Sequence, residues 1–156
     1  MVKLKKGAVL EFSSSEGYAY AQYVNDNEDF GELIRVFRGM HVRRPAVIED
    51  VVQGEELVLG FFPLRAAIRR GIVEVVGTAP ISEADRVFPI FKDGLVNPES
   101  GETYWWLWDG TKEWPVGELT AEQERYPLRR AFNDTYVVEL VAEDAKKAAF
   151  RRPNGC

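Results

Sequence analysis

The sequence predicts an α+β fold in a single domain, residues 1–156. The domain is expected to contain a bent antiparallel sheet or a partly open β-barrel, a short mid-chain helix and a C-terminal helical segment. The chain length of 156 residues suits one ordinary domain. Short apolar runs separated by Gly, Pro, Ser and Asn clusters fill the first two-thirds of the chain, which is typical of strands. The last part is polar, with an apolar stripe at helical spacing.

The N-terminal part predicts three strands. "AVLEF" (8–12) and "YAYAQYV" (18–24) flank "SSSEG", a turn cluster of hairpin length. In the second run tyrosine and alanine alternate, which gives a bulky face and a small face at a period of two. A polar loop follows, and "LIRVFR" (33–38) predicts the third strand.

The middle of the chain predicts a strand, a helix and a second strand. "ELVLGFF" (56–62) is nearly continuous in apolar residues, as in a strand buried on both faces. "PLRAAIRRG" (63–71) begins with proline and ends with glycine, which favours a short helix. "IVEVVG" (72–77) predicts the next strand, whereas 45–54 suits either an irregular strand or one or two helical turns.

The C-terminal half mixes both kinds of element. An edge-like strand is predicted over 86–94, because Pro89 cannot donate to an interior ladder, and a further strand over 104–109. The segment 118–132 is helix-prone but interrupted by a proline. Residues 133–150 predict a helix from their apolar stripe, although the valines also suit a strand. The last residues, "RRPNGC", are expected to be flexible.

The stretch "YWWLWDGTKEWP" contains all four tryptophans of the chain. Strand alternation would place Tyr104, Trp106 and Trp108 on one face, and Trp105 and Leu107 on the other. Each tryptophan can bury about 150–250 Å², a large part of what a small core needs. We therefore expect most of the side chains in this stretch to lie in the core, with one or two rings reaching the surface as contact anchors.

Composition and charge argue against several classes of partner. The formal net charge is −5 and the basic residues are dispersed in short pairs, so a nucleic-acid partner is not expected. No apolar run approaches the roughly 20 residues that a membrane span needs. The N-terminal apolar segment is too short for an export signal, so a cytoplasmic protein is expected.

The sequence offers little for catalysis, metals or cofactors. The single histidine, His41, lies among arginines, and the single cysteine is Cys156 at the end of the chain. A Ser-His-Asp or Cys-His site and a thiolate zinc site are therefore not expected. Phosphate-binding glycine motifs are absent, so no cofactor is predicted.

One alternative of a different class remains open, a carbohydrate-active or carbohydrate-binding domain. The 25 acidic residues could supply a carboxylate pair, and a tryptophan-rich strand suits stacking on sugar rings. The sequence alone does not place two carboxylates at the required separation.

Two groups of acidic residues, one within 26–29 and one at 49–50, are candidates for a partner-binding surface. As solvated loop charges they need no function, but they would also steer a basic protein partner towards this chain. Together with one aromatic anchor, the predicted binding residues are Asp26, Glu28, Asp29, Glu49, Asp50 and Trp105.

The pattern along the chain resembles the immunity protein 26 family of bacterial polymorphic-toxin systems. The resemblance covers "KKGAVLEF…GYAYAQYV" (5–24), "ELVLGFFPLRAAIRRGIVEVVGTAPISE" (56–83) and "VVELVAED" (137–144). The chain departs from it at Ala8, where an acidic residue is expected, and at Ile72, where tryptophan is frequent. The resemblance implies a non-enzymatic protein that binds and neutralises a cognate toxin. It implies no catalytic residue, and it leaves the toxin and the oligomeric state open.

Overall fold

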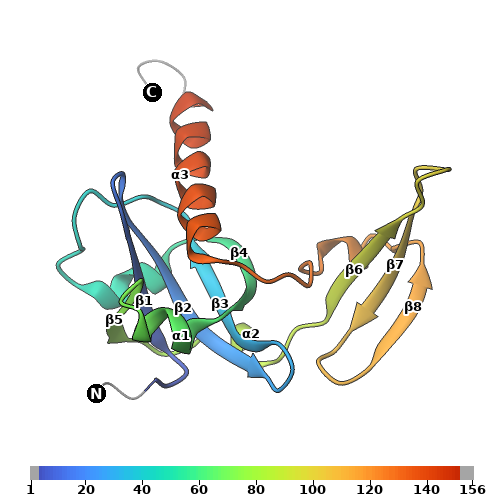
Figure 1. The fold of residues 1–156 in the computed structure, drawn as a ribbon, viewed down its shortest axis with the longest axis horizontal. Coiled ribbons are helices and arrows are strands. Elements are labelled where there is room, and N and C mark those ends of the chain that lie inside the picture. The colour runs from blue at the N-terminus through green and yellow to red at the C-terminus, as the bar shows by residue number, and fades with distance from the viewer. Residues whose placement is uncertain (1–3, 152–156) are drawn as a thin grey trace. The chain divides into compact units, whose positions relative to one another are not determined.

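The computed structural model describes residues 4–151 and confirms the α+β class, with 24% helix and 39% strand. Its main antiparallel sheet is bent and is not closed into a barrel. The chain forms two compact units, one combining the segment up to Ile81 with the segment from Ala131 onward, the other Ser82–Arg130 (Figure 1). All but the first residue of the predicted flexible tail lies outside the described residues.

The first unit is built on a five-stranded sheet with the order β4-β3-β2-β1-β5. All neighbouring strands are antiparallel. The register shifts within three of the four pairs, and such bulges bend and twist a sheet. The strands are β1 (Ala8–Ser14), β2 (Gly17–Asn27), β3 (Gly31–Phe37), β4 (Glu56–Phe62) and β5 (Val73–Thr78).

One face of this sheet packs on two helices, α1 (Leu64–Arg69) and α3 (Asp134–Arg151). Phe12 and Phe62 meet edge to face there, with ring centroids 5.4 Å apart, and both are buried. Val137 and Val141 of α3 are buried in the same cluster. Leu140 packs against the same cluster, so the buried side of this segment follows the i, i+3, i+4 spacing of a helix, and the helix prevails over the strand alternative.

The other face is covered by a 3-10 helix, η1 (Ile48–Gln53). Its Val51 is buried in a small cluster with Tyr20 and Phe37 of the sheet. The ambiguous segment 45–54 therefore forms helical turns rather than a strand.

Local signals explain where the helices begin and end. Pro63 directly precedes α1, and Gly71, at a φ of +73° that favours glycine, follows the end of that helix. At the start of α3 the Asn133 side-chain oxygen accepts a hydrogen bond from the Tyr136 amide at 2.7 Å. This bond satisfies one of the free amides of the first turn.

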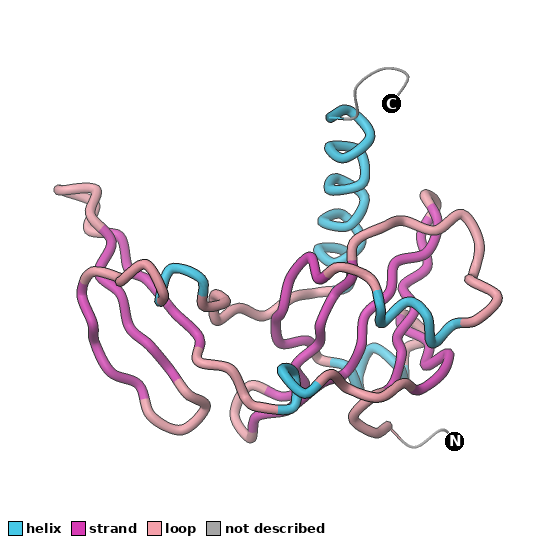
Figure 2. The backbone as a smooth tube through the Cα atoms, turned by 180° about the vertical axis from the view of Figure 1, so that it is seen from behind, coloured by secondary structure: helices cyan, strands magenta, loops and turns pink. Residues whose placement is uncertain are grey.

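The second unit contains a three-stranded antiparallel sheet of β6 (Phe91–Val96), β7 (Thr103–Trp108) and β8 (Glu113–Gly117). The strand expected over 86–94 begins later, because α2 (Glu83–Arg86) is a helical turn capped by Ser82 and the proline falls in the connection. In the helix-prone region only η2 (Gln123–Arg125) forms (Figure 2).

The edge of β6 is partly covered by the chain that leaves η2. The Lys92 amide donates to the Pro127 carbonyl, and the Arg129 amide donates to the Lys92 carbonyl, both at 2.9 Å. This short parallel pairing fixes Arg129 beside the sheet.

Candidate functional site on the three-stranded sheet

Strand register brings aromatic and charged side chains together on one face of the second sheet. Residues directly opposite each other in antiparallel strands project to the same side. The pairs include Phe91 with Trp108, Asp93 with Trp106, Leu95 with Tyr104, Trp106 with Pro115, and Trp108 with Glu113. We call these eight residues the aromatic face.

One end of the aromatic face is core. Phe91 and Trp108 are 0% and 6% exposed, with ring centroids 5.6 Å apart. Phe88 meets both rings edge to face, at 5.7 and 5.6 Å. The core interpretation of the tryptophan segment is thus correct for Trp108 and for Leu107, which is 4% exposed.

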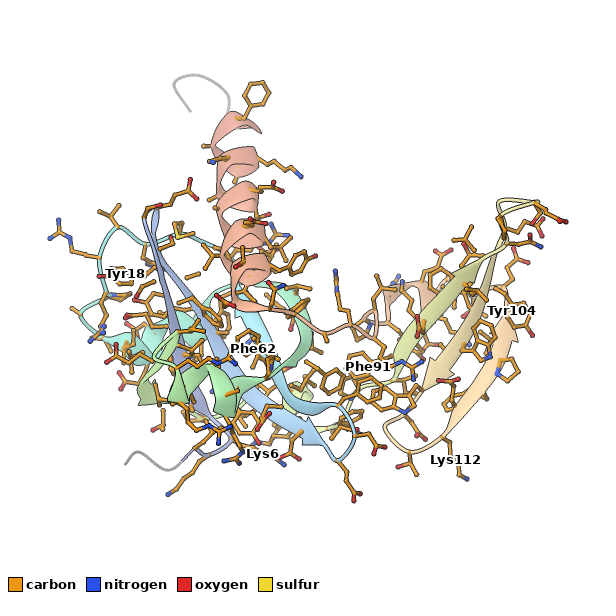
Figure 3. The ribbon with its side chains drawn as sticks, viewed as in Figure 1. Lys6, Tyr18, Phe62, Phe91, Tyr104 and Lys112 are labelled. Carbon is orange, nitrogen blue, oxygen red and sulfur yellow. The ribbon has the colours of Figure 1, made fainter. Side chains whose placement is uncertain are left out.

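The other end of the aromatic face is open. Leu95 is 66% exposed and Tyr104 49% exposed, although both are large apolar side chains on a strand. The Tyr104 and Trp106 rings meet at 4.8 Å and 64°. Figure 3 shows Phe91 and Tyr104 towards opposite ends of this sheet.

An ion-pair group crosses the middle of the face. Arg129 Nη2 lies 2.8 Å from Asp93 Oδ2, and Arg129 Nη1 lies 2.7 Å from Glu113 Oε2. The guanidinium also lies over the Trp108 ring, 5.1 Å from its centroid. Burial acts to lower the pKa of Arg129, but the hydrogen bonds to Asp93 and Glu113 outweigh it and raise that pKa. The guanidinium therefore stays charged and holds β6 and β8 together.

A shallow hollow opens beside this ion-pair group, with a volume of about 320 Å³. Its size lies at the lower end of the roughly 300–1,000 Å³ of ligand pockets. It combines an indole ring with two carboxylates and a guanidinium, so it suits a ligand that is both apolar and polar. Its lining residues are Asp93, Gly94, Leu95, Trp106, Glu113 and Arg129.

Trp105, the predicted anchor, lies on the opposite face of β7 and is half-buried. Its ring packs against Gly94, where an added Cβ would lie 2.9 Å from the ring. Lys92 Nζ lies 5.7 Å from the centroid of the same ring. The tryptophan that lines the hollow is Trp106 rather than Trp105.

The two predicted acidic groups are exposed but lie apart. Asp26, Glu28 and Asp29 lie at the β2–β3 connection, where Asp26 accepts a hydrogen bond from the Tyr23 hydroxyl at 2.7 Å. Glu49 and Asp50 occupy the first turn of η1. In Figure 1 the blue β2–β3 connection and the turquoise segment around residue 50 lie in different parts of the first unit. The structure does not bring the two groups into one cluster.

A buried carboxylate that the sequence did not single out lies in the first unit. Glu11 is 2% exposed and accepts hydrogen bonds from the Tyr20 hydroxyl at 2.8 Å and from Arg44 at 2.8 and 2.9 Å. Hydrogen bonds from Arg44 lower the pKa of Glu11 against the opposing effect of burial, and the Tyr20 bond lowers it further. Such a carboxylate is a poor general acid at neutral pH.

The Glu11 network fastens a chain segment to the sheet. His41 packs edge to face on Tyr20, with centroids 5.1 Å apart, and its backbone exchanges two hydrogen bonds with Tyr18. Arg44 then bonds Glu11 from the same segment. The histidine is therefore placed by packing, and we assign the network to stability.

Sequence reasoning missed Asp93, Glu113 and Arg129 as a group. The alternation along β6 indicates the position of Asp93, because Phe91, Asp93 and Leu95 follow each other at a period of two and so share one face of the strand. That pattern is clear only once the strand is placed over residues 91–96.

Within residues 4–151 no three His, Cys, Asp or Glu side chains are grouped so as to hold a metal ion. In the same range no helix has the length and apolar character needed to cross a membrane. When the chain is compared with models of protein families, with curated proteins and with solved structures, none of the three comparisons finds a match.

Proposed function

We propose that this protein is a non-enzymatic immunity protein that binds a protein toxin in the cytoplasm and blocks it by contact. The observation that carries the proposal is the open end of the aromatic face. Exposed Leu95 and Tyr104 adjoin Trp106 and the fixed Arg129 ion-pair group. Tryptophan, tyrosine and arginine are the residues most enriched in interface hot spots. The resemblance to the immunity protein 26 family supports the same function.

The charge of the second unit supports a basic partner. Ser82–Arg130 contains six Lys and Arg residues and ten Asp and Glu residues, which is a net charge of −4. The whole chain carries −5, so most of the excess negative charge lies in this unit. An acidic surface speeds the encounter with a basic protein and adds specificity.

Calorimetry tests the proposal directly. The toxins of such immunity proteins are often encoded next to them, so the full chain is titrated with the product of a neighbouring toxin-like gene whose catalytic residue is disabled. We expect one-to-one binding with a nanomolar Kd, which corresponds to a standard free energy of binding of about −12 kcal/mol. An unrelated basic protein of similar size serves as the control for charge alone. No binding at micromolar concentrations, or equal binding of the control, would refute the proposal for that partner.

The predicted acidic surface on the first unit is tested with the same partner. Charge reversal at Asp26, Glu28 and Asp29 together should slow association and weaken its salt dependence. Because Glu49 and Asp50 lie elsewhere on the unit, they are reversed in a separate variant. Unchanged association kinetics in either variant would show that the acidic group reversed in it is not part of the toxin-binding surface.

A second candidate function, carbohydrate binding, is favoured by one observation. Trp106 lines the hollow together with two carboxylates, Asp93 and Glu113. An indole and hydrogen-bond acceptors are what a sugar ring would contact. A saturable change in tryptophan fluorescence on titration with neutral oligosaccharides, lost in Trp106→Phe, would support it. No response to any sugar would exclude it.

A further inference from the structure

We infer that the open end of the aromatic face receives a basic, partly apolar segment of the partner protein. An Arg or Lys side chain of that segment would lie over Trp106, between Asp93 and Glu113, with an apolar neighbour on Leu95 and Tyr104. The inference rests on the proposed function and names its contact surface and the chemistry of the contact.

The accessible charge at the hollow is negative. The side chains of Asp93 and Glu113 are 47% and 45% exposed, whereas that of Arg129 is only 16% exposed. Each carboxylate uses one oxygen on the guanidinium, which leaves the other oxygen of each group for a new donor. Two carboxylates against one covered guanidinium favour a cationic ligand over an anionic one.

The rings of β7 suit cations. Lys92 lies 5.7 Å from the Trp105 centroid, and Arg129 lies 5.1 Å from the Trp108 centroid. Trp106 lies between Trp105 and Trp108 in the sequence of β7, and it lines the hollow. A ring close to two carboxylates attracts a cation through both its quadrupole and the charges, and the attraction grows when water is excluded.

The apolar neighbours define the rest of the contact. Leu95 and Tyr104 are paired across β6 and β7, and their exposed surface adjoins Trp106. Contiguous exposed apolar surface beside polar groups marks interaction sites. The edge strand β8 carries Pro115, which cannot donate to an added strand, and this favours a contact through side chains over backbone pairing at that edge.

The strongest test compares two neighbouring residues of β6. Leu95 and Val96 are 66% and 57% exposed and project to opposite faces of the same strand. With the disabled toxin as the ligand, Leu95→Ser should raise the Kd about tenfold or more, because the apolar side chain would be buried in the contact. Val96→Ser should leave the Kd within about twofold. Because both positions are exposed, both variants are expected to fold, and circular dichroism checks this.

A second pair of variants tests the charge. Glu113→Gln and Glu102→Gln remove the same charge from the same unit, but only Glu113 lines the hollow. We expect Glu113→Gln to weaken binding about fivefold and to reduce its salt dependence, in line with a charged contact. If the two variants weaken binding equally, the loss comes from net charge, and the proposed contact of the partner's basic side chain with Glu113 is wrong.

The outcomes separate this inference from the proposed function. If the wild-type chain binds the toxin and Leu95→Ser and Val96→Ser bind equally well, the immunity function stands and this surface is wrong. If the wild-type chain does not bind, the proposed function fails for that partner, and the face is tested with capped peptides of alternating Leu and Arg or Leu and Glu. The Arg peptide should shift the Trp106 indole NMR signal, less so in Glu113→Gln. Equal shifts with the Glu peptide, or none, would overturn the inference.

Discussion

Replacing Glu11 with glutamine tests whether the buried network holds the first unit together. The carboxylate accepts three hydrogen bonds, one from Tyr20 and two from Arg44, and is 2% exposed. Glutamine has nearly the same shape, but it offers one acceptor oxygen and presents an amide N–H to donors. At least one of the three donors, from Tyr20 or Arg44, then loses its acceptor beside a buried side chain.

The expected loss follows from the number and kind of these bonds. A hydrogen bond to a charged group contributes about 1.5–3 kcal/mol, and breaking a buried ion pair costs about 3–5 kcal/mol. Arg44 is half exposed and recovers some solvation, so we expect a loss of about 3 kcal/mol in the free energy of unfolding. For a chain of this size that loss corresponds to a Tm lower by about 6–12 °C.

Urea unfolding at pH 7 measures this loss, with Glu74→Gln as the matched control. Glu74 also bonds Arg44, at 3.3 Å, but its side chain is 66% exposed. Exposed ion pairs contribute about 0–1 kcal/mol, so the control should stay close to the wild type. If the two variants lose the same small amount at an unchanged m-value, the stabilising role of the buried carboxylate is refuted.

Three further predictions follow from the same structure. The pKa of Glu11 is lowered on folding, so its stabilising effect is fully present above its ordinary pKa of 4.5 and declines as the pH falls below 4.5 through the lower pKa of the folded state. The gap in urea midpoints between wild type and Glu11→Gln should therefore shrink as the pH is lowered from about 5. At Gly60 an added Cβ would lie 2.3 Å from the Phe132 ring, so Gly60→Ala should cost about 1–3 kcal/mol in thermal unfolding, and less in a Phe132→Leu background. Removing the buried indole with Trp108→Phe should shift the tryptophan emission maximum to the red, because the remaining tryptophans are half-exposed; a blue shift would contradict the burial pattern.

Local periodicity was enough to predict most of the elements. Tyr and Ala alternate along β2, which predicts a strand, and the helical stripe of Val137, Leu140, Val141 and Ala145 predicts α3. Alternation also predicted correctly that Tyr104 and Trp106 share a face of β7. These signals act over a few residues and need no knowledge of the partner strand.

Tertiary pairing decided the groupings on which the proposals rest. Glu11 meets Arg44 from 33 residues away, and Arg129 meets Asp93 from 36 residues away. The division into two sheets and the strand β8 were likewise absent from the sequence prediction. Charge and residue type suggested the acidic loops and Trp105, whereas register placed Trp106, Asp93 and Glu113 around one hollow. Which strands pair, and in which register, depends on contacts between distant segments, and no local pattern specifies them.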